Sequence, residues 1–416
     1  MNGEAAVLDA GDPLAPVAEE FHHPLDAAGR RAVYLCGHSL GLQPKAAATY
    51  LAEELADWRD LGVRGHHVGR RPWIGYHERL AGPLARLAGA APTEVVAMNS
   101  LTVNLHLLLV SFFRPQGDRR RILIERSAFP SDRYAIVSQL EFHGLDATRD
   151  LIEVAPRPGE RCLRTEDLIE AIEREGPRLA LVLLPGVQYL TGQRLDVAPL
   201  AAACRANGAA FGLDLAHAIG NTPLSLHDWN VDFAVWCSYK YLNGGPGAIG
   251  GGFVHARHAR DSDRPRFAGW WGHDKASRFA MGPQFRPIPG AEGWQLSNPP
   301  VLASAPLLAS LEIFERAGFD RLRAKSLAQS AYLRDSIERC APGRVEFLTP
   351  AEPQAHGAQL SLRVPGGRAT FDRLGEAGVI ADWREPDVLR LAPAPAYNSF
   401  ADLDRAAIAL AGSLPK

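Results

Sequence analysis

Short apolar runs alternate with helical patterns from Thr93 onward, and this alternation constrains the fold more than any other feature of the sequence. The apolar runs are "EVVAMNS", "RILIER", "LALVLLP" and "AAFGLDL", and the helical patterns between them are "LTVNLHLLLVSFF", "SDRYAIVSQLEFHG" and "APLAAACRANG". Runs that are apolar at nearly every position are typical of parallel strands buried on both faces. Two further runs, "VDFAVWCS" and "GAIGGGFVH", add strands without long helices between them. The sequence therefore predicts an α/β fold with a mostly parallel sheet.

The pattern changes after the proline pair that ends at Pro300. A helical stretch at 301–340 is followed by the strand-like "GAQLSLRV", the helical "RATFDRLGEAG" and the strand-like "VIADWR" and "VLRLAP". This second pattern predicts a smaller α+β domain with its own sheet, and a chain of 416 residues is long enough for two cores. We expect a large domain at residues 46–300 and a small domain made of residues 1–45 and 301–416.

The charge balance favours a small molecule as the binding partner. Lys and Arg number 45 against 47 Asp and Glu, which gives a formal charge of -2 and no basic field for nucleic acid or an anionic membrane. The five cysteines form no C-x-x-C pair, which fits a reducing cytoplasm. The N-terminus has no signal-peptide pattern, and no apolar run is long enough for a membrane span. We therefore expect a cytoplasmic protein.

One lysine, Lys240, lies inside the apolar and aromatic stretch "DFAVWCSYKYLNGGPG". A lysine in such a place either extends its amine to solvent or serves as a desolvated nucleophile toward a carbonyl group. This stretch alone leaves both readings open, and the residues at the other strand ends decide between them.

Ligands of open parallel sheets bind outside the carboxyl ends of the strands, and several predicted strands end in reactive side chains. Asp214 closes one strand and is followed by His217; without further ligands this pair does not predict a metal site. Thr102 begins a helix whose free N–H groups suit a phosphate. Phe129 offers an aromatic plane at another strand end, beside the polar residues Ser131 and Asp132.

A lysine, a carboxylate, a phosphate-binding helix end and an aromatic ring are what pyridoxal phosphate requires of a protein. This convergence favours the nucleophilic reading of Lys240, and the neighbouring Tyr239 adds a phenol that can donate to the phosphate or act as an acid. The glycines in "GPGAIG" match G-x-G-x-x-G, but a strand-like segment follows them where a dinucleotide site needs a helix.

The chain resembles the kynureninase family of fold type I pyridoxal-phosphate enzymes, in the aminotransferase class V superfamily, along most of its length. The matching segments are "GHSLGLQPK", "GRRPW", "FPSD", "YLTGQ", "DLAHAIGN", "DWNVDFAVWCSYKYLN", "WWGH", "LSNPP" and "LRLAPAPAYNSF". The resemblance implies a fold type I architecture and hydrolysis of L-kynurenine, or its 3-hydroxy form, to an anthranilate and L-alanine.

The resemblance also implies roles for individual residues. Lys240 is expected to hold the cofactor, Asp214 to pair with the pyridinium nitrogen, Phe129 to stack on the ring, and Tyr239 to act as the acid. The residues expected around the cofactor, its phosphate or the substrate are Leu101, Thr102, Ser131, Asp132, His217, Trp270 and Asn298. Trp270 and Asn298 are expected to reach across a homodimer interface.

Four residues are expected at the substrate: Arg390 as the clamp of its carboxylate, and His66, Asn298 and Trp271 at its aromatic end. A bidentate guanidinium suits a carboxylate. Crowding by the Trp271 indole is expected to favour L-kynurenine over the 3-hydroxy substrate, whereas a hydrogen bond from His66 would reverse that order.

Two positions depart from the family pattern: His38 stands where an asparagine is expected, and Pro185 where a serine or threonine is common. Neither departure replaces Lys240 or Asp214, so the expected reaction class is unchanged. Two rival functions also remain: a sulfur-removing lyase such as a cysteine desulfurase-like enzyme, and a non-catalytic protein that uses the same scaffold to bind a partner.

Overall fold

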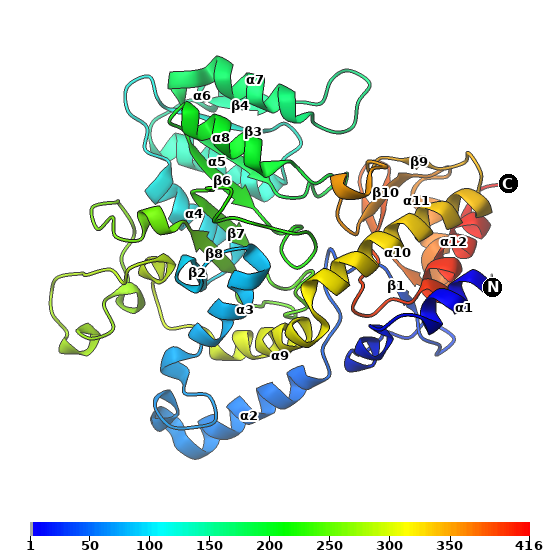
Figure 1. Ribbon diagram of the computed structural model, residues 1–416, viewed down its shortest axis with the longest axis horizontal. Coiled ribbons are helices and arrows are strands. Elements are labelled where there is room, and N and C mark those ends of the chain that lie inside the picture. The colour runs from blue at the N-terminus through cyan, green and yellow to red at the C-terminus, as the bar shows by residue number, and fades with distance from the viewer. Residues whose placement is uncertain (1–2) are drawn as a thin grey trace.

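A computed structural model describes residues 3–416, and its main element is a mixed seven-stranded sheet (Figure 1). The strand order is β2-β8-β7-β6-β5-β3-β4. All neighbouring pairs from β7 to β4 are parallel, and only β8 runs against its neighbours. The predicted, mostly parallel sheet is therefore present. Its strands are β2 (Val95–Ala97), β3 (Arg121–Glu125), β4 (Leu151–Val154), β5 (Leu179–Pro185), β6 (Ala210–Asp214), β7 (Phe233–Trp236) and β8 (Gly251–Val254).

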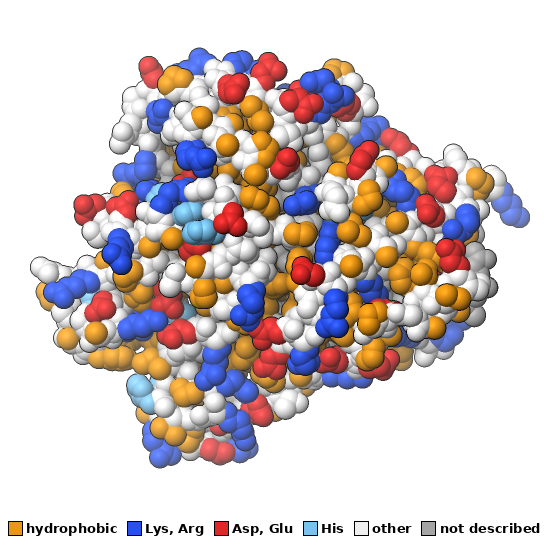
Figure 2. All heavy atoms as spheres, in the orientation of Figure 1, with side chains coloured by type: hydrophobic (Ala, Val, Ile, Leu, Met, Phe, Trp, Pro, Cys, Tyr) orange, Lys and Arg blue, Asp and Glu red, His pale blue; other side chains and the backbone are white. Residues whose placement is uncertain are grey.

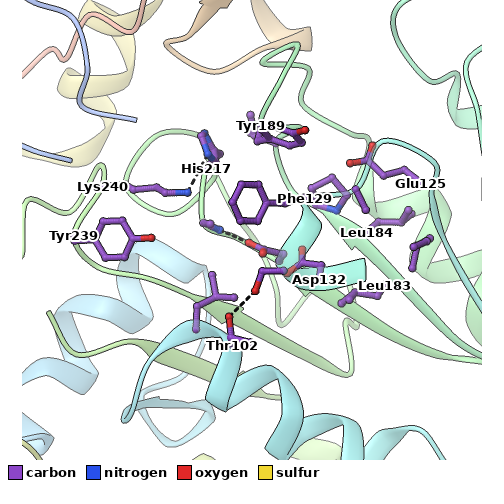
Figure 3. A pocket seen from close by; sticks show the side chains of 18 residues that line it. Thr102, Glu125, Phe129, Asp132, Leu183, Leu184, Tyr189, His217, Tyr239 and Lys240 are labelled. Atoms are coloured by element: carbon purple, nitrogen blue, oxygen red, sulfur yellow. Dashed lines mark hydrogen bonds between the residues drawn. The ribbon is translucent and has the colours of Figure 1, made fainter. Parts of the chain in front are cut away.

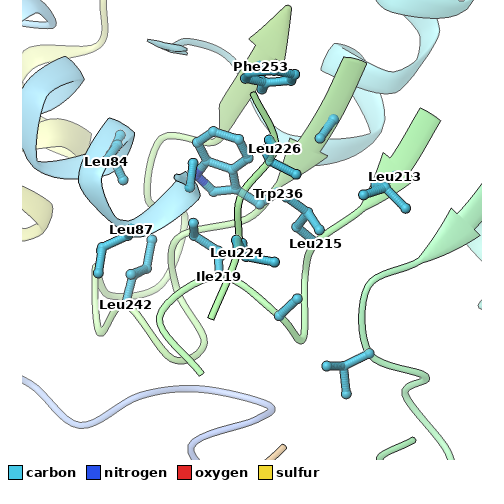
Figure 4. Packing of buried hydrophobic residues seen from close by; sticks show 14 of the residues in the cluster. Leu84, Leu87, Leu213, Leu215, Ile219, Leu224, Leu226, Trp236, Leu242 and Phe253 are labelled. Carbon is cyan, nitrogen blue, oxygen red and sulfur yellow. The ribbon is translucent and has the colours of Figure 1, made fainter. Parts of the chain in front are cut away.

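Helices cover both faces of this sheet, which explains why its strands are apolar at nearly every position. Along β3, Ile122 and Ile124 pack into one hydrophobic cluster while Leu123 packs into another on the opposite face. Figure 4 shows part of the second cluster, with Trp236 at its centre and Leu215, Leu226 and Phe253 around it. The helices of this part are α2 (Ala46–Leu61), α3 (Glu78–Ala88), α4 (Leu101–Phe112), α5 (Pro130–Phe142), α6 (Ala147–Asp150), α7 (Thr165–Glu175) and α8 (Val197–Ala206).

A second, antiparallel sheet of four strands in the order β12-β13-β10-β9 lies toward the C-terminus. Here β1, from the N-terminal segment, pairs with β11, and α1 lies beside α12, so both chain ends meet in this part (Figure 1). The elements are α1 (Gly3–Ala10), β1 (Val33–Tyr34), α10 (Phe319–Cys340), β9 (Glu346–Phe347), β10 (Leu360–Arg363), α11 (Arg368–Glu376), β11 (Val379–Ile380), β12 (Asp382–Arg384), β13 (Val388–Leu391) and α12 (Phe400–Ser413).

The helical stretch expected at 301–340 forms two helices, α9 (Val301–Ala317) and α10, because Gly318 between them has a positive φ of 77°. Apolar side chains of α9, such as Leu307 and Leu311, pack into the same cluster as the seven-stranded sheet. The division into domains at Pro300 stays a prediction, and residues 1–2 of the expected small domain lie outside the described residues.

Acidic and basic side chains are interspersed over the face shown in Figure 2, with apolar side chains among them. Among residues 3–416, none of the helices is both long enough and apolar enough to span a bilayer.

Candidate active site

A pocket opens at the carboxyl ends of β3, β5 and β6, where the sequence predicted a ligand site (Figure 3). It encloses about 690 Å³ of empty space, part of it open to solvent. Its lining combines apolar, hydroxyl, carboxyl and cationic groups, supplied by Leu101, Thr102, Ile124, Glu125, Ala128, Phe129, Ser131, Asp132, Leu183, Leu184, Pro185, Val187, Tyr189, Asp214, Ala216, His217, Tyr239 and Lys240. The pocket therefore brings together eight of the predicted cofactor residues beside Lys240: Leu101, Thr102, Phe129, Ser131, Asp132, Asp214, His217 and Tyr239.

Lys240 lies in the loop after β7, and its amine contacts a buried imidazole. Its Nζ lies 3.0 Å from Nε2 of His217, and 5.8 Å from the centre of the Phe129 ring. Burial first, and then the charge of Lys240, hold the pKa of His217 well below its usual range. The imidazole is therefore neutral, and its Nε2 can accept a hydrogen bond from the Lys240 amine.

The backbone of the Lys240 segment is fixed by a close approach of Gly41. The Gly41 N–H donates to the Tyr239 carbonyl oxygen at 2.8 Å. A Cβ at Gly41 would lie 2.4 Å from the Lys240 carbonyl oxygen and 2.2 Å from Oδ1 of Asn243. Only glycine fits this contact, so the N-terminal segment positions the loop that carries the lysine.

Two buried carboxyl groups, Asp214 and Asp132, lie together in the pocket. Asp214 ends β6, and its Oδ1 accepts the Ala216 N–H at 2.6 Å. Burial, reinforced by the neighbouring Asp214 carboxylate, raises the pKa of Asp132 well above its usual range. One oxygen of Asp132, Oδ1, is buried without a hydrogen-bond partner. A protonated ring nitrogen would give this carboxyl pair the donor that the protein does not supply.

Two helices begin at the pocket and present hydroxyl groups there. Thr102 lies in the first turn of α4 and Ser131 in the first turn of α5, and their Oγ atoms are 2.9 Å apart. The free N–H groups of helix N-termini and paired hydroxyls form a donor set that suits a phosphate.

These residues fit pyridoxal phosphate on several independent grounds. The chain has five lysines, Lys45, Lys240, Lys275, Lys325 and Lys416, and only Lys240 lines the pocket. Lys325 is buried against Asp12, and Lys275 pairs with Glu78 and Glu292. The donor set at the helix ends matches the phosphate, and the carboxyl pair matches the ring nitrogen.

Two pocket residues, Glu125 and Tyr189, were not singled out by the sequence. Glu125 closes the apolar run of β3 and accepts from Nε2 of Gln188 at 3.3 Å; burial raises its pKa to about 7. Tyr189 packs edge-on against Phe129 at 5.2 Å between ring centres. Glu125 could have been predicted from the sequence, because it is the polar residue that ends a buried strand, as Asp214 is.

Five predicted residues, Trp270, Trp271, His66, Asn298 and Arg390, do not line the pocket of this chain. Trp270 is 41% exposed, and its Nε1 donates to the Arg278 carbonyl oxygen, whereas Asn298 is exposed. Trp271 is buried beneath the Arg278 guanidinium, which lies 4.4 Å from the indole. His66 packs edge-on against Trp73, with the ring centres 5.5 Å apart.

Arg390, the expected carboxylate clamp, is buried behind the pocket wall. Its Nη1 donates to the carbonyl oxygen of Tyr189 at 2.7 Å, and its Nη2 to Oδ1 of Asp382 at 2.6 Å. Arg390 is not among the residues that line the cavity, but its hydrogen bond to the Tyr189 carbonyl oxygen connects it to a residue that is.

The two departures from the family pattern both lie near this site. Pro185 ends β5 opposite Asp214 and lines the pocket, where it offers no hydroxyl group. His38 is fully buried, with its ring centre 6.2 Å from that of His217 and neither ring nitrogen hydrogen-bonded. Burial, together with the charges of Arg390 and Lys240, lowers the pKa of His38 well below its usual range, so this imidazole is neutral too.

A cluster of Glu94, His227 and His255 lies outside the pocket, where the sequence predicted no metal ligands. His255 Nδ1 accepts the Arg257 N–H at 3.1 Å, and His227 Nδ1 lies 2.9 Å from Glu94. Because the ring nitrogens nearest the carboxylate already have partners, hydrogen bonding accounts for this cluster.

Comparison with known proteins places this geometry in a family. Residues 322–410 match the family model for the kynureninase C-terminal domain. The chain is 56% identical to the kynureninase of Koribacter versatilis over 402 residues, which cover 96% of this chain and 95% of that protein. The kynureninase of Myxococcus xanthus is also 56% identical, over 96% of this chain and 94% of its own length.

Solved structures share the fold at lower identity. The cystine C-S lyase C-DES, in complex with cysteine persulfide, superimposes with a TM-score of 0.77 at 20% identity, over 92% of this chain and 98% of that one. The cysteine desulfurase CsdA from Escherichia coli gives a TM-score of 0.75 at 17% identity, over 98% of each chain. The predicted fold type I architecture is thereby confirmed, and the identity to full-length relatives shows that this chain belongs to the kynureninase family.

Proposed function

We propose that this protein hydrolyses L-kynurenine, or its 3-hydroxy form, to an anthranilate and L-alanine with pyridoxal phosphate as its cofactor. The observation that supports this most strongly is one pocket that holds Lys240, the pair of Asp214 and Asp132, and two helix N-termini in a chain of the kynureninase family. When bound, pyridoxal phosphate acts as an electron sink for bond cleavage next to the substrate amine.

The protein's own side chains would hold the cofactor and move protons. Lys240 would supply the amine that holds the cofactor, and the same amine can serve as a base toward the substrate. Asp214, with Asp132 beside it, would accept a hydrogen bond from the ring nitrogen and favour its protonated form. Burial raises the pKa of Tyr239, so its phenol keeps its proton at neutral pH and can donate it to a carbanion in the pocket.

The substrate contacts follow from the family resemblance. Arg390 would bind the α-carboxylate, with His66, Asn298 and Trp271 near the aromatic ring. The preference for L-kynurenine over the 3-hydroxy substrate stays a prediction, because in this single chain neither Trp271 nor His66 lines the pocket.

We also propose a homodimer with its active sites at the subunit interface. Trp270 and Asn298 are exposed and lie outside the pocket of their own chain, as residues serving a partner's site would. A cytoplasmic location accords with five cysteines that form no disulfide among the described residues.

The desulfurase-like alternative is less well supported. No cysteine is among the residues that line the pocket in the described chain, although a sulfur-removing lyase of this fold would use one. The non-catalytic alternative is also less well supported, because the residues that would carry the reaction are present at matching positions.

Incubation of the purified protein with pyridoxal phosphate and L-kynurenine tests the proposal. We expect anthranilate, followed by its fluorescence, and L-alanine in equal amounts, and no turnover by the Lys240→Ala variant. Release of sulfide from L-cysteine without cleavage of kynurenine would instead support the desulfurase-like reading.

A further inference from the structure

The guanidinium of Arg390 is held mainly by one carboxylate. Its Nε and Nη2 donate to Oδ1 of Asp382 at 2.9 and 2.6 Å. Its Nη1 donates to the Tyr189 carbonyl oxygen at 2.7 Å, and its Nη2 also faces the Ser39 hydroxyl at 3.4 Å. These contacts fix both the position and the plane of the guanidinium.

Asp382 is itself fixed from two sides. Asp382 lies on β12 directly opposite Arg390 on β13. The register of the two strands therefore brings the two side chains close together. The Ser39 hydroxyl, from the N-terminal segment, donates to Oδ2 of Asp382 at 2.6 Å. Asp382 therefore ties the N-terminal segment and the small sheet to the arginine.

Two arginines face the single carboxylate of Asp382, so the cluster has a net positive charge. A second guanidinium, that of Arg384, lies on the same carboxylate with its Nε 3.0 Å from Oδ1. Two cations facing one carboxylate carry a net charge of +1. Burial lowers the pKa of Arg390 and the charge of Asp382 opposes this. A single substrate carboxylate would neutralise the cluster. Without Asp382, the buried Arg390 and the partly exposed Arg384 would carry a net charge of +2.

Arg390 also has hydrogen-bond donors that are not fully occupied. A guanidinium has five N–H groups. The contacts above employ four of them, and the one to Ser39 is long at 3.4 Å. The guanidinium thus keeps donor capacity while Asp382 holds its other edge.

We propose that Asp382 is a positioning residue for substrate recognition: it orients Arg390 against the Tyr189 peptide and sets the local charge so that one α-carboxylate is bound. This rests on the proposed function, in which Arg390 binds that carboxylate. Asp382 itself does not touch the substrate, and Ser39 holds Asp382 in place.

The Asp382→Asn variant tests this in the pyridoxal-phosphate-loaded enzyme, with Asp387→Asn as the matched control. Asp387 lies in the same hairpin and accepts from Nε of Arg363 at 2.5 Å, outside the pocket. We expect Asp382→Asn to raise KM for L-kynurenine about tenfold or more, with kcat within about threefold of wild type. Ser39→Ala should raise KM less, and Asp387→Asn should leave KM unchanged.

A ligand without a carboxylate distinguishes a loss of carboxylate recognition from a general disturbance of the active site. The decarboxylated amine of kynurenine should inhibit wild type and Asp382→Asn equally, because it lacks the group that Arg390 binds. Equal weakening of both ligands, or a KM in Asp382→Asn like that of Asp387→Asn, would overturn the assignment. If Asp382→Asn does not fold, Ser39→Ala with an unchanged KM would overturn it.

A crystal structure keeps this inference separate from the proposed function. If wild type fails to cleave kynurenine, the proposed function fails, but the role of Asp382 can still be read from the position of Arg390. In Asp382→Asn the guanidinium should leave the Tyr189 carbonyl oxygen. An Arg390 that stays in place would overturn the positioning role.

Discussion

Lys240 and His217 form a direct contact in the pocket, with Nζ of the lysine 3.0 Å from Nε2 of the imidazole. Because burial keeps His217 neutral, the imidazole can accept a hydrogen bond from the amine without adding a charge to the pocket. This contact holds the amine over the ring of Phe129, on which the cofactor ring is expected to stack.

We predict that His217→Leu lowers kcat/KM about tenfold or more, because the amine of Lys240 loses the acceptor that orients it. His217→Gln keeps an acceptor in a similar place and should lose less. Steady-state kinetics on both variants check this, with thermal unfolding to confirm that each is folded. Equal activity of His217→Leu and wild type would show that the contact has no part in turnover.

A second prediction concerns the buried carboxyl pair. The folded protein raises the pKa of Asp132 above its ordinary value of 3.8, so the folded state binds this proton more tightly than the unfolded state does. The cofactor-free protein should therefore lose stability as pH rises from about 4 through the pKa of Asp132.

Asp132→Asn removes this penalty and should stabilise the cofactor-free protein at pH 7 by roughly 1–3 kcal/mol, while weakening pyridoxal phosphate binding. The gain should shrink toward zero as pH falls to about 4. Urea unfolding across this pH range measures it, with the exposed Asp118→Asn as the control. A gain that does not vary with pH would contradict the ionic explanation.

Much of this site follows from the sequence, for a physical reason. Parallel strands buried on both faces, such as β3 and β5, leave continuous apolar runs, and the polar residues that end them meet at one edge of the sheet. The meeting of Asp214 with the hydroxyls at the two helix starts could therefore be predicted from the sequence.

Other features depend on contacts that no local pattern reports. The amphipathic helices α3 and α7 were not predicted, and the break at Gly318 was read as continuous helix. The pairing of Asp382 with Arg390 depends on strand register, and its link to Ser39 spans more than three hundred residues. These contacts can be identified only in the folded structure, because the residues are far apart in the sequence.

A third prediction tests how the N-terminal segment supports the lysine loop. Gly41→Ala should destabilise the protein by about 1–3 kcal/mol, because its Cβ would overlap the Lys240 carbonyl oxygen. Gly375→Ala in α11 is the control, since nothing lies within 4 Å of a Cβ there. Chemical denaturation of both variants measures the difference. An equal effect at the two positions would mean that the close approach at Gly41 can be relieved at little cost.

A fourth prediction concerns subunits that share a site. If Asn298 serves the partner's pocket, Lys240→Ala and Asn298→Ala subunits should complement each other when mixed. A hybrid dimer then has one intact site, so random one-to-one mixing should restore about a quarter of wild-type activity. Subunits are exchanged in mild denaturant and then assayed. Activity no higher than the mean of the two parent variants would contradict a shared site.

Reduction with borohydride shows which lysine holds pyridoxal phosphate, and we expect this lysine to be Lys240. The enzyme is loaded with the cofactor, reduced, digested and analysed by mass spectrometry. Because the chain has only five lysines, each candidate peptide can be resolved. We expect a pyridoxyl group on the peptide that contains Lys240 and none on the others, with loss of the visible absorbance in Lys240→Ala. Labelling of another lysine, or no labelling of a protein that still cleaves kynurenine, would contradict it.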